Sequence, residues 1–336
     1  MLRIGIIGAG FMGSMHASCY RALASEGAVI AAVAATTPER AQKLAEGTDA
    51  ICYTDGMDLI MDPSIDVVDI CTPTYLHTTY AVAAMEQGKA VFIEKPVCLT
   101  PEETTILLDA QERTGAAVMV GQCVRLWSEY AWLKDITDRG TYGKLLSGVF
   151  KRVSPLPTWG SNGWLLKAET CGTACLDMHV HDVDYVRYLL GEPDSFQSMG
   201  QRDAEGVLQQ IYTSYRFGDA VVTTEACWDY PVSFPFSMAF RVKFEKAAVM
   251  FDSATIPLTV YPYDGDVFSP EMKEEYEGSS EAGGNLSSLG AYFSELKYFV
   301  THLVSGEPIA MNTLEDAVAS VRLTFQEIER CGGAKI

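Results

Sequence analysis

The amino-terminal residues constrain the fold more than any other part of the sequence. An apolar, β-rich run covers 2–7, and Gly8, Gly10 and Gly13 follow it at the spacing G-x-G-x-x-G, directly before a helical pattern. In such a strand–turn–helix unit the first glycine permits a tight turn, the second lets the backbone approach a pyrophosphate, and the third permits close packing of helix on strand. The pattern predicts a dinucleotide-binding unit at the start of the chain.

The sequence up to residue 123 continues with short apolar runs that alternate with helical patterns. The predicted helices include 38–46 and 101–113. The further predicted strands are 29–34, 51–53, 67–71, 90–94 and 117–121. This alternation is typical of a parallel sheet with crossover helices, so a doubly wound Rossmann domain is expected over residues 1–123.

The pattern changes in the second part of the chain. Phe240, Val242 and Phe244 alternate with charged residues, which favours an antiparallel sheet with one covered face. Helical patterns follow at 289–304 and 313–330. We predict a second domain of α/β class over residues 124–336.

The composition fits a packed two-domain protein with an acidic surface. Hydrophobic residues make up 48% of the 336 residues, and the formal net charge is −19, from 25 basic and 44 acidic side chains. Such a surface repels nucleic-acid phosphates and anionic lipid, so neither nucleic acid nor a membrane is an expected partner. An anionic cofactor is still compatible, because the N–H groups at a helix N-terminus act locally.

The cysteine usage bears on the cellular compartment. Nine cysteines, an odd number, are scattered through the chain, which is typical of free thiols in a reducing environment. No run approaches the roughly 20 apolar residues that span a bilayer, and residue 1 leads directly into the first strand instead of a signal peptide. A cytoplasmic protein is expected.

The rest of the dinucleotide site is expected at the carboxyl ends of the strands, where open parallel sheets bind their ligands. For His16 and His77, packing or a helix-terminal position is the favoured interpretation. The full set of candidate cofactor contacts is Gly8, Gly10, Phe11, Met12, Gly13, Ala35, Thr36, Thr37, Arg40, Cys71, Thr72, Pro73, His77, Glu94, Lys95, Pro96 and Gln122.

Four motifs occur in order along the chain: Gly8-x-Gly10-x-x-Gly13-x-x-His16, Cys71-Thr72-Pro73-x-x-x-His77, Glu94-Lys95-Pro96 and Asp177-Met178-His179-Val180-His181-Asp182. Together they resemble the glucose-fructose oxidoreductase and inositol dehydrogenase (Gfo/Idh/MocA) family over nearly the whole chain. The resemblance implies that the second domain holds a large, mainly antiparallel open sheet that often mediates oligomerisation, as a dimer or tetramer. It also implies hydride transfer between NAD(P) and a hydroxyl-bearing carbon of a sugar, inositol or related polyol.

The resemblance further implies the catalytic residues. Lys95 matches the lysine of the family's E-K-P motif, which lies beside the substrate hydroxyl. Asp177 and His181 match its catalytic positions, and at a spacing of four they share one face of a helix. A histidine that titrates near neutrality suits removal of the hydroxyl proton, and Asp177 would orient it or bind a neighbouring hydroxyl. We expect the three side chains to converge beside the nicotinamide.

A metal site is the alternative interpretation of the same segment. Cys171, Cys175 and His179 would share one face of a continuous helix, while Asp177 and His181 would lie on the opposite face. The five cannot converge on one ion. We predict no metal and buried thiols in a core, and a Cys/Cys/His zinc site with a further ligand from elsewhere is the competing possibility.

Candidate substrate contacts lie outside these motifs as well. Trp159 and Trp164 fall in a stretch of prolines and glycines, and aromatic faces beside polar donors suit a carbohydrate, although tryptophans in loops are at least as often packing anchors. Arg125, just beyond the last predicted strand of the first domain, is a further candidate. With Lys95, Asp177 and His181 these residues form the predicted substrate site.

The end of the second strand predicts the preferred cofactor. NAD-preferring Rossmann domains place an acid there that accepts hydrogen bonds from the ribose 2′-hydroxyl, whereas this chain has Ala35. Thr36, Thr37 and Arg40 could bind a 2′-phosphate at the start of the following helix, although Glu39 opposes it. NADP is therefore the predicted cofactor, with NAD as the alternative.

Two other functions compete with a sugar or polyol dehydrogenase. A relative that retains its cofactor could cleave or epimerise a glycoside through transient oxidation, and net redox turnover separates it from a dehydrogenase. A dinucleotide-sensing protein without chemistry is the rival of another class. Lys95, Asp177 and His181 argue against the sensor, because a sensor needs none of them.

Overall fold

The computed structural model describes residues 1–158, 160–272, 276, 278 and 288–333. These residues form two compact units. The first holds residues 1–123, 160–164, 276, 278 and 288–319, and the second holds 124–158, 165–272 and 320–333. Because the first unit takes in part of the C-terminal region, the predicted functional division at residue 123 stays a prediction.

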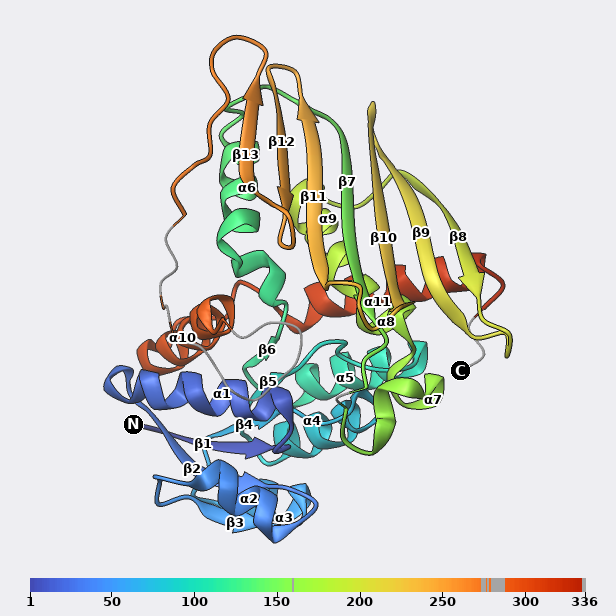
Figure 1. The fold of residues 1–336 in the computed structure, drawn as a ribbon. Coiled ribbons are helices and arrows are strands. Elements are labelled where there is room, and N and C mark those ends of the chain that lie inside the picture. Colours follow the sequence, from blue (N-terminus) through green and yellow to red (C-terminus); the bar gives the residue numbers. More distant parts are fainter. Residues whose placement is uncertain (159, 273–275, 277, 279–287, 334–336) are drawn as a thin grey trace. The chain divides into compact units, whose positions relative to one another are not determined.

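A six-stranded parallel sheet forms the centre of the first unit (Figure 1). Its order is β3-β2-β1-β4-β5-β6. The order in which strands are added reverses between β1 and β4, and this point marks a ligand-binding crevice in doubly wound folds. The bounds are β1 Leu2–Ile7, β2 Ala28–Ala34, β3 Ile51–Tyr53, β4 Val67–Ile70, β5 Ala90–Ile93 and β6 Val118–Val120. β4 is buried along its whole length, as expected for a strand covered on both faces.

The helices of the first unit start where the sequence signals a start. The helix α5 opens with a capping box, in which the Thr100 side chain accepts from the Glu103 N–H and the Glu103 side chain accepts from the Thr100 N–H. The helix α10 packs against α1. The bounds are α1 Phe11–Ala22, α2 Pro38–Ala45, α3 Gly56–Met61, α4 His77–Glu86, α5 Pro101–Thr114 and α10 Gly290–Ser305.

A seven-stranded sheet forms the second unit, in the order β13-β12-β11-β7-β10-β9-β8. The β7–β10 pair is parallel and the other pairs are antiparallel. The bounds are β7 Leu145–Pro155, β8 Ser195–Arg202, β9 Leu208–Phe217, β10 Ala220–Tyr230, β11 Ser237–Phe244, β12 Ala247–Asp252 and β13 Ile256–Pro262. The predicted α/β fold, with a Rossmann sheet and a large, mainly antiparallel sheet, is confirmed.

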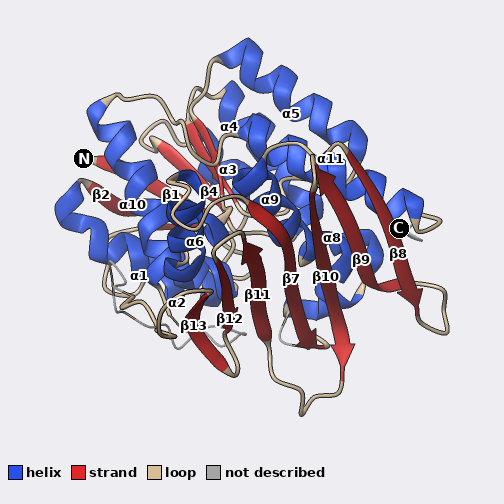
Figure 2. Cartoon of the chain, turned by 90° about the horizontal axis from the view of Figure 1, so that it is seen from above, coloured by secondary structure: helices blue, strands red, loops and turns tan. Residues whose placement is uncertain are grey.

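Helices cover one face of this second sheet (Figure 2). They are α6 Ser128–Asp138, α8 Ala174–Asp177 and α9 His179–Leu190, and the short α7 Ala168–Cys171 lies between α6 and α8 in the chain. The core between helices and sheet is aromatic: the buried Tyr130 ring of α6 meets the rings of Tyr185 and Phe240 edge-on, at centroid distances of 4.8 and 5.1 Å. Alternate residues of β7 and β10, such as Val149 and Val221, are exposed on the other face.

The last helix, α11 Leu314–Arg330, begins in the first unit and ends in the second. Of the helices in the described ranges, none is both long enough and apolar enough to cross a membrane.

Candidate active site

The three glycines of the first turn differ in what surrounds them. A Cβ on Gly8, whose φ is +110°, would lie 2.4 Å from the carbonyl oxygen of Cys71, and a Cβ on Gly13 would lie 1.9 Å from the carbonyl oxygen of Gly8. A Cβ on Gly10 would meet no atom of the other described residues within 4 Å. Gly8 and Gly13 are therefore required by the packing of the turn itself, whereas Gly10 leaves open space beside the backbone.

That open space lies at the N-terminus of α1. Gly10 is the N-cap of this helix and offers no side-chain cap, and the first turn contains no acidic residue. The N–H groups of a helix N-terminus bind anions, and a pyrophosphate is the ligand for which this turn is built in dinucleotide-binding folds. The predicted contacts Phe11 and Met12 are the first two residues of α1 and are half-buried. These residues fit a dinucleotide.

The end of β2 carries the residues expected near the adenosine ribose. Ala35 is buried next to β2, and its N–H donates to the carbonyl of Tyr53 at 3.1 Å. Thr36, Thr37 and Arg40 are exposed around the start of α2, whose N-cap Thr37 makes no side-chain capping bond. The structure therefore leaves hydroxyl groups and one guanidinium accessible at this position, without a carboxylate on residue 35.

His77 joins the loops that follow β4 and β5. Its Nδ1 lies 2.8 Å from the carbonyl oxygen of Pro96, and its Nε2 lies 2.9 Å from that of Thr72. Burial lowers the pKa of His77, although the two carbonyls act in the opposite direction. This first residue of α4 is thus a structural link between two predicted cofactor loops, in agreement with the helix-terminal position expected for it.

A buried glutamine, Gln122, lies two residues beyond the end of β6. The Gln122 carbonyl accepts from the Asn312 side chain at 3.4 Å, and both residues are buried. Asn312 was not among the predicted site residues, because no local pattern connects two residues that are 190 positions apart.

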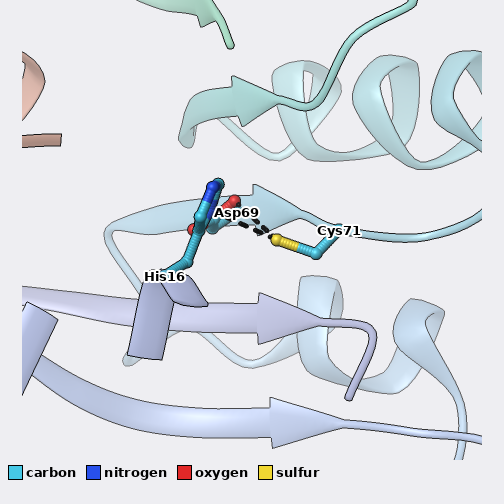
Figure 3. A group of neighbouring side chains, drawn as sticks. All are labelled: His16, Asp69 and Cys71. Atoms are coloured by element: carbon cyan, nitrogen blue, oxygen red, sulfur yellow. Dashed lines mark hydrogen bonds and ion pairs between the residues drawn. The ribbon is translucent and has the colours of Figure 1, made fainter. Parts of the chain in front are cut away.

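A buried polar group lies under the glycine turn (Figure 3). Nδ1 of His16, on α1, lies 2.8 Å from Oδ2 of Asp69 and 3.3 Å from Sγ of Cys71, and the thiol also donates to Oδ1 of Asp69 at 3.4 Å. On its other side, Nε2 of His16 lies 3.1 Å from Oε1 of Glu94. His16 is thus held between β4 and the end of β5.

This arrangement fixes the charge of the imidazole and the thiol. Burial acts to lower the pKa of His16, but the negative charge of Asp69 and the contacts with Cys71 outweigh it and raise that pKa well above its ordinary value. Burial raises the pKa of the Cys71 thiol. Cys71 is therefore a neutral donor at neutral pH and a poor nucleophile or metal ligand. The sequence interpretation missed Asp69, although a charged residue within the apolar strand 67–70 is itself a signal.

Lys95 follows Glu94 at the carboxyl end of β5. The Lys95 N–H donates to Oε2 of Glu94 at 3.1 Å, and the Glu94 N–H donates to the carbonyl of Ile70 in β4 at 3.1 Å. The Lys95–Pro96 peptide bond is cis, and the Lys95 side chain is half-buried. The turn that carries the predicted catalytic lysine is therefore fixed by its own glutamate.

The second predicted catalytic segment consists of three short helices. Gly172 and Thr173 have φ values of +72° and +65° and separate α7 from α8, and the residues of α8 and α9 are separated only by Met178. The expectation of one continuous helix from Cys171 onward is therefore wrong. The Thr173 side chain accepts from the Cys175 N–H at 3.3 Å, which caps α8 locally.

Asp177 ends α8, and His181 lies in the first turn of α9. Asp177 is 9% exposed and His181 is half-buried. Both belong to the second unit, whereas Lys95 belongs to the first.

Three buried side-chain pairs hold α9. His179 Nε2 lies 2.7 Å from Oε2 of Glu327 on α11. Arg152 of β7 binds Asp182 at 3.1 and 3.3 Å, and Arg125 binds Asp184 at 2.8 and 2.7 Å. The Arg125 guanidinium, predicted to contact substrate, is thus buried and bidentate on Asp184, which gives it a structural role. The helix that carries His181 is anchored on three sides.

The thiols of the alternative zinc site donate hydrogen bonds to backbone carbonyl groups. The Cys171 thiol donates to the carbonyl of Leu165 at 3.3 Å, and the Cys175 thiol donates to that of Leu208 at 3.5 Å. Burial raises the pKa of Cys175. Among the described residues, the groups with metal-ligand spacing are His16 with Asp69 and Cys71, and His16 with Glu94 and Glu295. Neither group contains a residue of the alternative zinc site.

Of the two tryptophan candidates, Trp164 lies among the described residues. Trp164 is half-buried in a 3-10 segment, Ser161–Leu166, whose Asn162 and Gly163 have positive φ values. Trp159 lies outside the described residues.

Two family models match the chain in the order of its units. The model described as an oxidoreductase family with an NAD-binding Rossmann fold matches residues 2–122, and the model of the GFO/IDH/MocA C-terminal domain matches residues 130–250. The chain belongs to the Gfo/Idh/MocA oxidoreductase family. The family expected from the four motifs is thereby confirmed, as is an NAD-binding Rossmann fold.

Known Gfo/Idh/MocA relatives align with different shares of the chain. Levoglucosan dehydrogenase of Pseudarthrobacter phenanthrenivorans is 34% identical over 204 residues, 57% of this chain and 52% of the relative. Myo-inositol 2-dehydrogenase of Thermotoga maritima is 25% identical over 334 residues, 93% of this chain and 91% of the relative. The chain thus spans about half the length of the first relative and most of the second.

Solved structures share the whole Gfo/Idh/MocA fold. Levoglucosan dehydrogenase in complex with NADH and levoglucosan superposes with a TM-score of 0.84 at 23% identity, over 98% of this chain and 97% of that one. An oxidoreductase from Agrobacterium radiobacter in complex with NAD⁺, L-tartaric acid and magnesium gives a TM-score of 0.85 at 17% identity, over 98% and 96%. At these identities the superpositions show that the fold is shared.

Proposed function

We propose that this chain is an NAD(P)-dependent dehydrogenase that oxidises a hydroxyl-bearing carbon of a sugar, inositol or related polyol, or reduces the corresponding ketone. The observation that carries the proposal is the open backbone at Gly10 at the uncapped N-terminus of α1, in a family whose N-terminal model is NAD-binding. Relatives named as levoglucosan and inositol dehydrogenases support this substrate class.

Each predicted catalytic residue has a role in this reaction. When bound, the nicotinamide supplies a hydride acceptor at the substrate carbon. The Lys95 ammonium donates a hydrogen bond to the reacting oxygen and favours its deprotonated form. His181 takes the hydroxyl proton, and Asp177 orients the imidazole or binds a neighbouring hydroxyl. In this reaction His181 would hold the hydroxyl proton, and a bound nicotinamide would take the hydride from the same carbon, which leaves the carbonyl.

The anchoring of α9 supports the role of His181. A proton acceptor must lie within hydrogen-bond reach of the hydroxyl, and misplacement by about 1 Å can cost 100-fold in rate. The pairs Arg152–Asp182 and Arg125–Asp184 restrain the helix directly after His181. These buried pairs are positioning elements.

NADP is the proposed cofactor, with NAD as the alternative. Support comes from the exposed Thr36, Thr37 and Arg40 and from the absence of an acid at Ala35. A ribose 2′-phosphate meets no repulsion from residue 35, while the N-terminus of α2 favours its negative charge. Glu39 in the first turn of α2 acts in the opposite direction.

The assembly and the compartment are also proposals. Exposed Val149, Val221 and Tyr212 on the second sheet suit a face that pairs with another copy in a dimer or tetramer. None of the nine cysteines, all of which the structure describes, is in a disulfide, which fits a reducing, cytoplasmic environment.

A screen of sugars and inositols with NAD and NADP tests the function. Substrate-dependent change in nicotinamide absorbance is expected for at least one polyol. Conversion of a glycoside without net change in the nicotinamide would instead indicate the retained-cofactor reaction, and binding without any conversion would indicate a sensor.

A further inference from the structure

The polar cluster inside the first unit includes a residue outside the family motifs. Glu295 on α10 and His16 on α1 are 0% exposed, and Glu94 at the end of β5 is 4% exposed. One nitrogen or oxygen atom from each of these side chains lies within 4.8 Å of the other two. The packing of α10 on α1 thus brings a third carboxyl group to the buried imidazole.

The charges in this cluster do not balance if every acid is ionised. The carboxyl groups of Asp69, Glu94 and Glu295 surround the single imidazole of His16, whose nitrogens already face Asp69 and Glu94. Neither oxygen of Glu295 has a hydrogen-bond partner within the described part of the chain. An isolated buried carboxylate is strongly disfavoured, so such a group takes up a proton unless a cation joins it.

The surroundings of Glu295 favour its neutral form. Burial raises the pKa of Glu295 well above its ordinary value, the neighbouring Glu94 raises it further, and His16 acts in the opposite direction. Burial also raises the pKa values of the thiols and phenols that interact with this cluster, so they add no charge at neutral pH. They are Cys19, Tyr20, Cys71 and Tyr292.

Glu94 needs a donor on one of its two oxygens. Oε2 accepts the Lys95 N–H at 3.1 Å. Oε1 lies 3.1 Å from His16 Nε2, but the two atoms do not form a hydrogen bond. Neither atom has another hydrogen-bond partner among the described residues. A second donor on Oε1 would hold the carboxylate in the orientation that receives Lys95.

We propose that Glu295 is a neutral carboxylic acid that donates a hydrogen bond to Glu94, directly or over one enclosed water, and so positions the Glu94–Lys95–Pro96 turn. Glu295 is thus a positioning residue that acts through Glu94 on Lys95. Only the kinetic consequence rests on the proposed dehydrogenase function. The protonation of Glu295 is a property of the folded protein and can be measured without turnover.

Infrared spectroscopy of the full chain tests the protonation directly. Glu295→Gln keeps a hydrogen-bond donor but removes the acid, so the carbonyl-stretch band of a protonated carboxylic acid should be present in the native protein and absent from the variant. Glu327→Gln is the matched control, because Glu327 is equally buried but pairs with His179 at 2.7 Å. The control should keep the band.

Kinetics separate positioning from general destabilisation. Glu295→Gln should keep kcat within about threefold, whereas Glu295→Leu, which offers no donor, should lower kcat about tenfold or more with a smaller change in KM. Rescue by glutamine is the signature, since a residue that only fills space would not distinguish the two. Thermal unfolding of both variants reports any loss of folded protein.

Three results would overturn the proposal. The first is that Glu295→Gln loses no carboxylic-acid band that the native protein shows. The second is an equal loss of kcat in Glu295→Gln and Glu295→Leu. The third is one equivalent of a divalent metal in the purified protein that Glu295→Gln removes, because the cluster would then be a cation site. If no polyol is turned over, the infrared comparison still decides the state of Glu295.

Discussion

A Cβ on Gly13 would lie 1.9 Å from the carbonyl oxygen of Gly8, closer than any van der Waals contact allows. Because that oxygen belongs to the backbone, Gly13→Ala must move the start of α1 away from the end of β1. We expect a loss of about 1–3 kcal/mol in the free energy of unfolding, the usual cost of forced overpacking. Urea unfolding of the variant measures it.

Gly10→Ala is the control for this prediction. Within the part of the chain that the structure describes, a Cβ on Gly10 has no neighbouring atom within 4 Å, and the φ of −93° is ordinary for alanine, so stability should change little. The methyl group would instead enter the space assigned to the pyrophosphate, and the dinucleotide Kd should rise at least about tenfold. Unchanged cofactor affinity in Gly10→Ala would contradict the assigned site.

Ala35→Asp should shift cofactor preference toward NAD. The new carboxylate can accept hydrogen bonds from a ribose 2′-hydroxyl and repels a 2′-phosphate. The ratio of kcat/KM for NADP over NAD should fall by about tenfold or more, while the isosteric, uncharged Ala35→Asn should change it less. A native preference for NAD that the aspartate leaves unchanged would refute both the preference and the position.

The buried pair of Arg125 and Asp184 should matter far more for stability than an exposed pair. Asp184→Ala leaves the guanidinium buried without its carboxylate, and we expect a loss of about 3–5 kcal/mol. Asp138→Ala removes the partner of Lys134 in an exposed i,i+4 pair and should cost about 0.3–0.5 kcal/mol. Equal effects in urea unfolding would show that Arg125 is not held as described.

The stability of the protein should depend on pH through His16. Because its pKa is raised in the folded state, this group contributes stability that is fully present below its unfolded pKa near 6.5 and is lost as the pH rises through the folded pKa. Within that window the free energy of unfolding should fall by up to about 1.4 kcal/mol per pH unit from this group. His16→Gln should remove that part of the slope in urea unfolding at several pH values, and parallel slopes would contradict the prediction.

The Rossmann sheet could be predicted from sequence because its physical cause is local. Buried strands such as β5 are continuous apolar runs, and the glycine turn has its own spacing. The break between α7 and α8 was missed because Thr173 adopts a positive φ, which its residue type does not predict. The place of Glu295 depends on the packing of α10 against α1, and no local pattern reports a contact between segments so far apart.

The substrate contacts could be predicted only in part. Arg125 has the chemistry of a substrate ligand, but its partner Asp184 lies 59 residues further along the chain. A basic residue and a distant acid become an ion pair only through the fold, so the sequence left both roles open. Asp177 and His181 came from a motif and remain proposals.

Substrate-dependent reduction of the nicotinamide tests the proposed dehydrogenase activity itself. Native protein is assayed with NAD and with NADP against a panel that includes myo-inositol and levoglucosan, beside Lys95→Ala and His181→Ala. We expect the native protein to turn over at least one polyol. In both variants kcat should fall by about 100-fold or more, with the dinucleotide Kd nearly unchanged. Turnover that survives both substitutions, or an equal loss of dinucleotide binding, would contradict it.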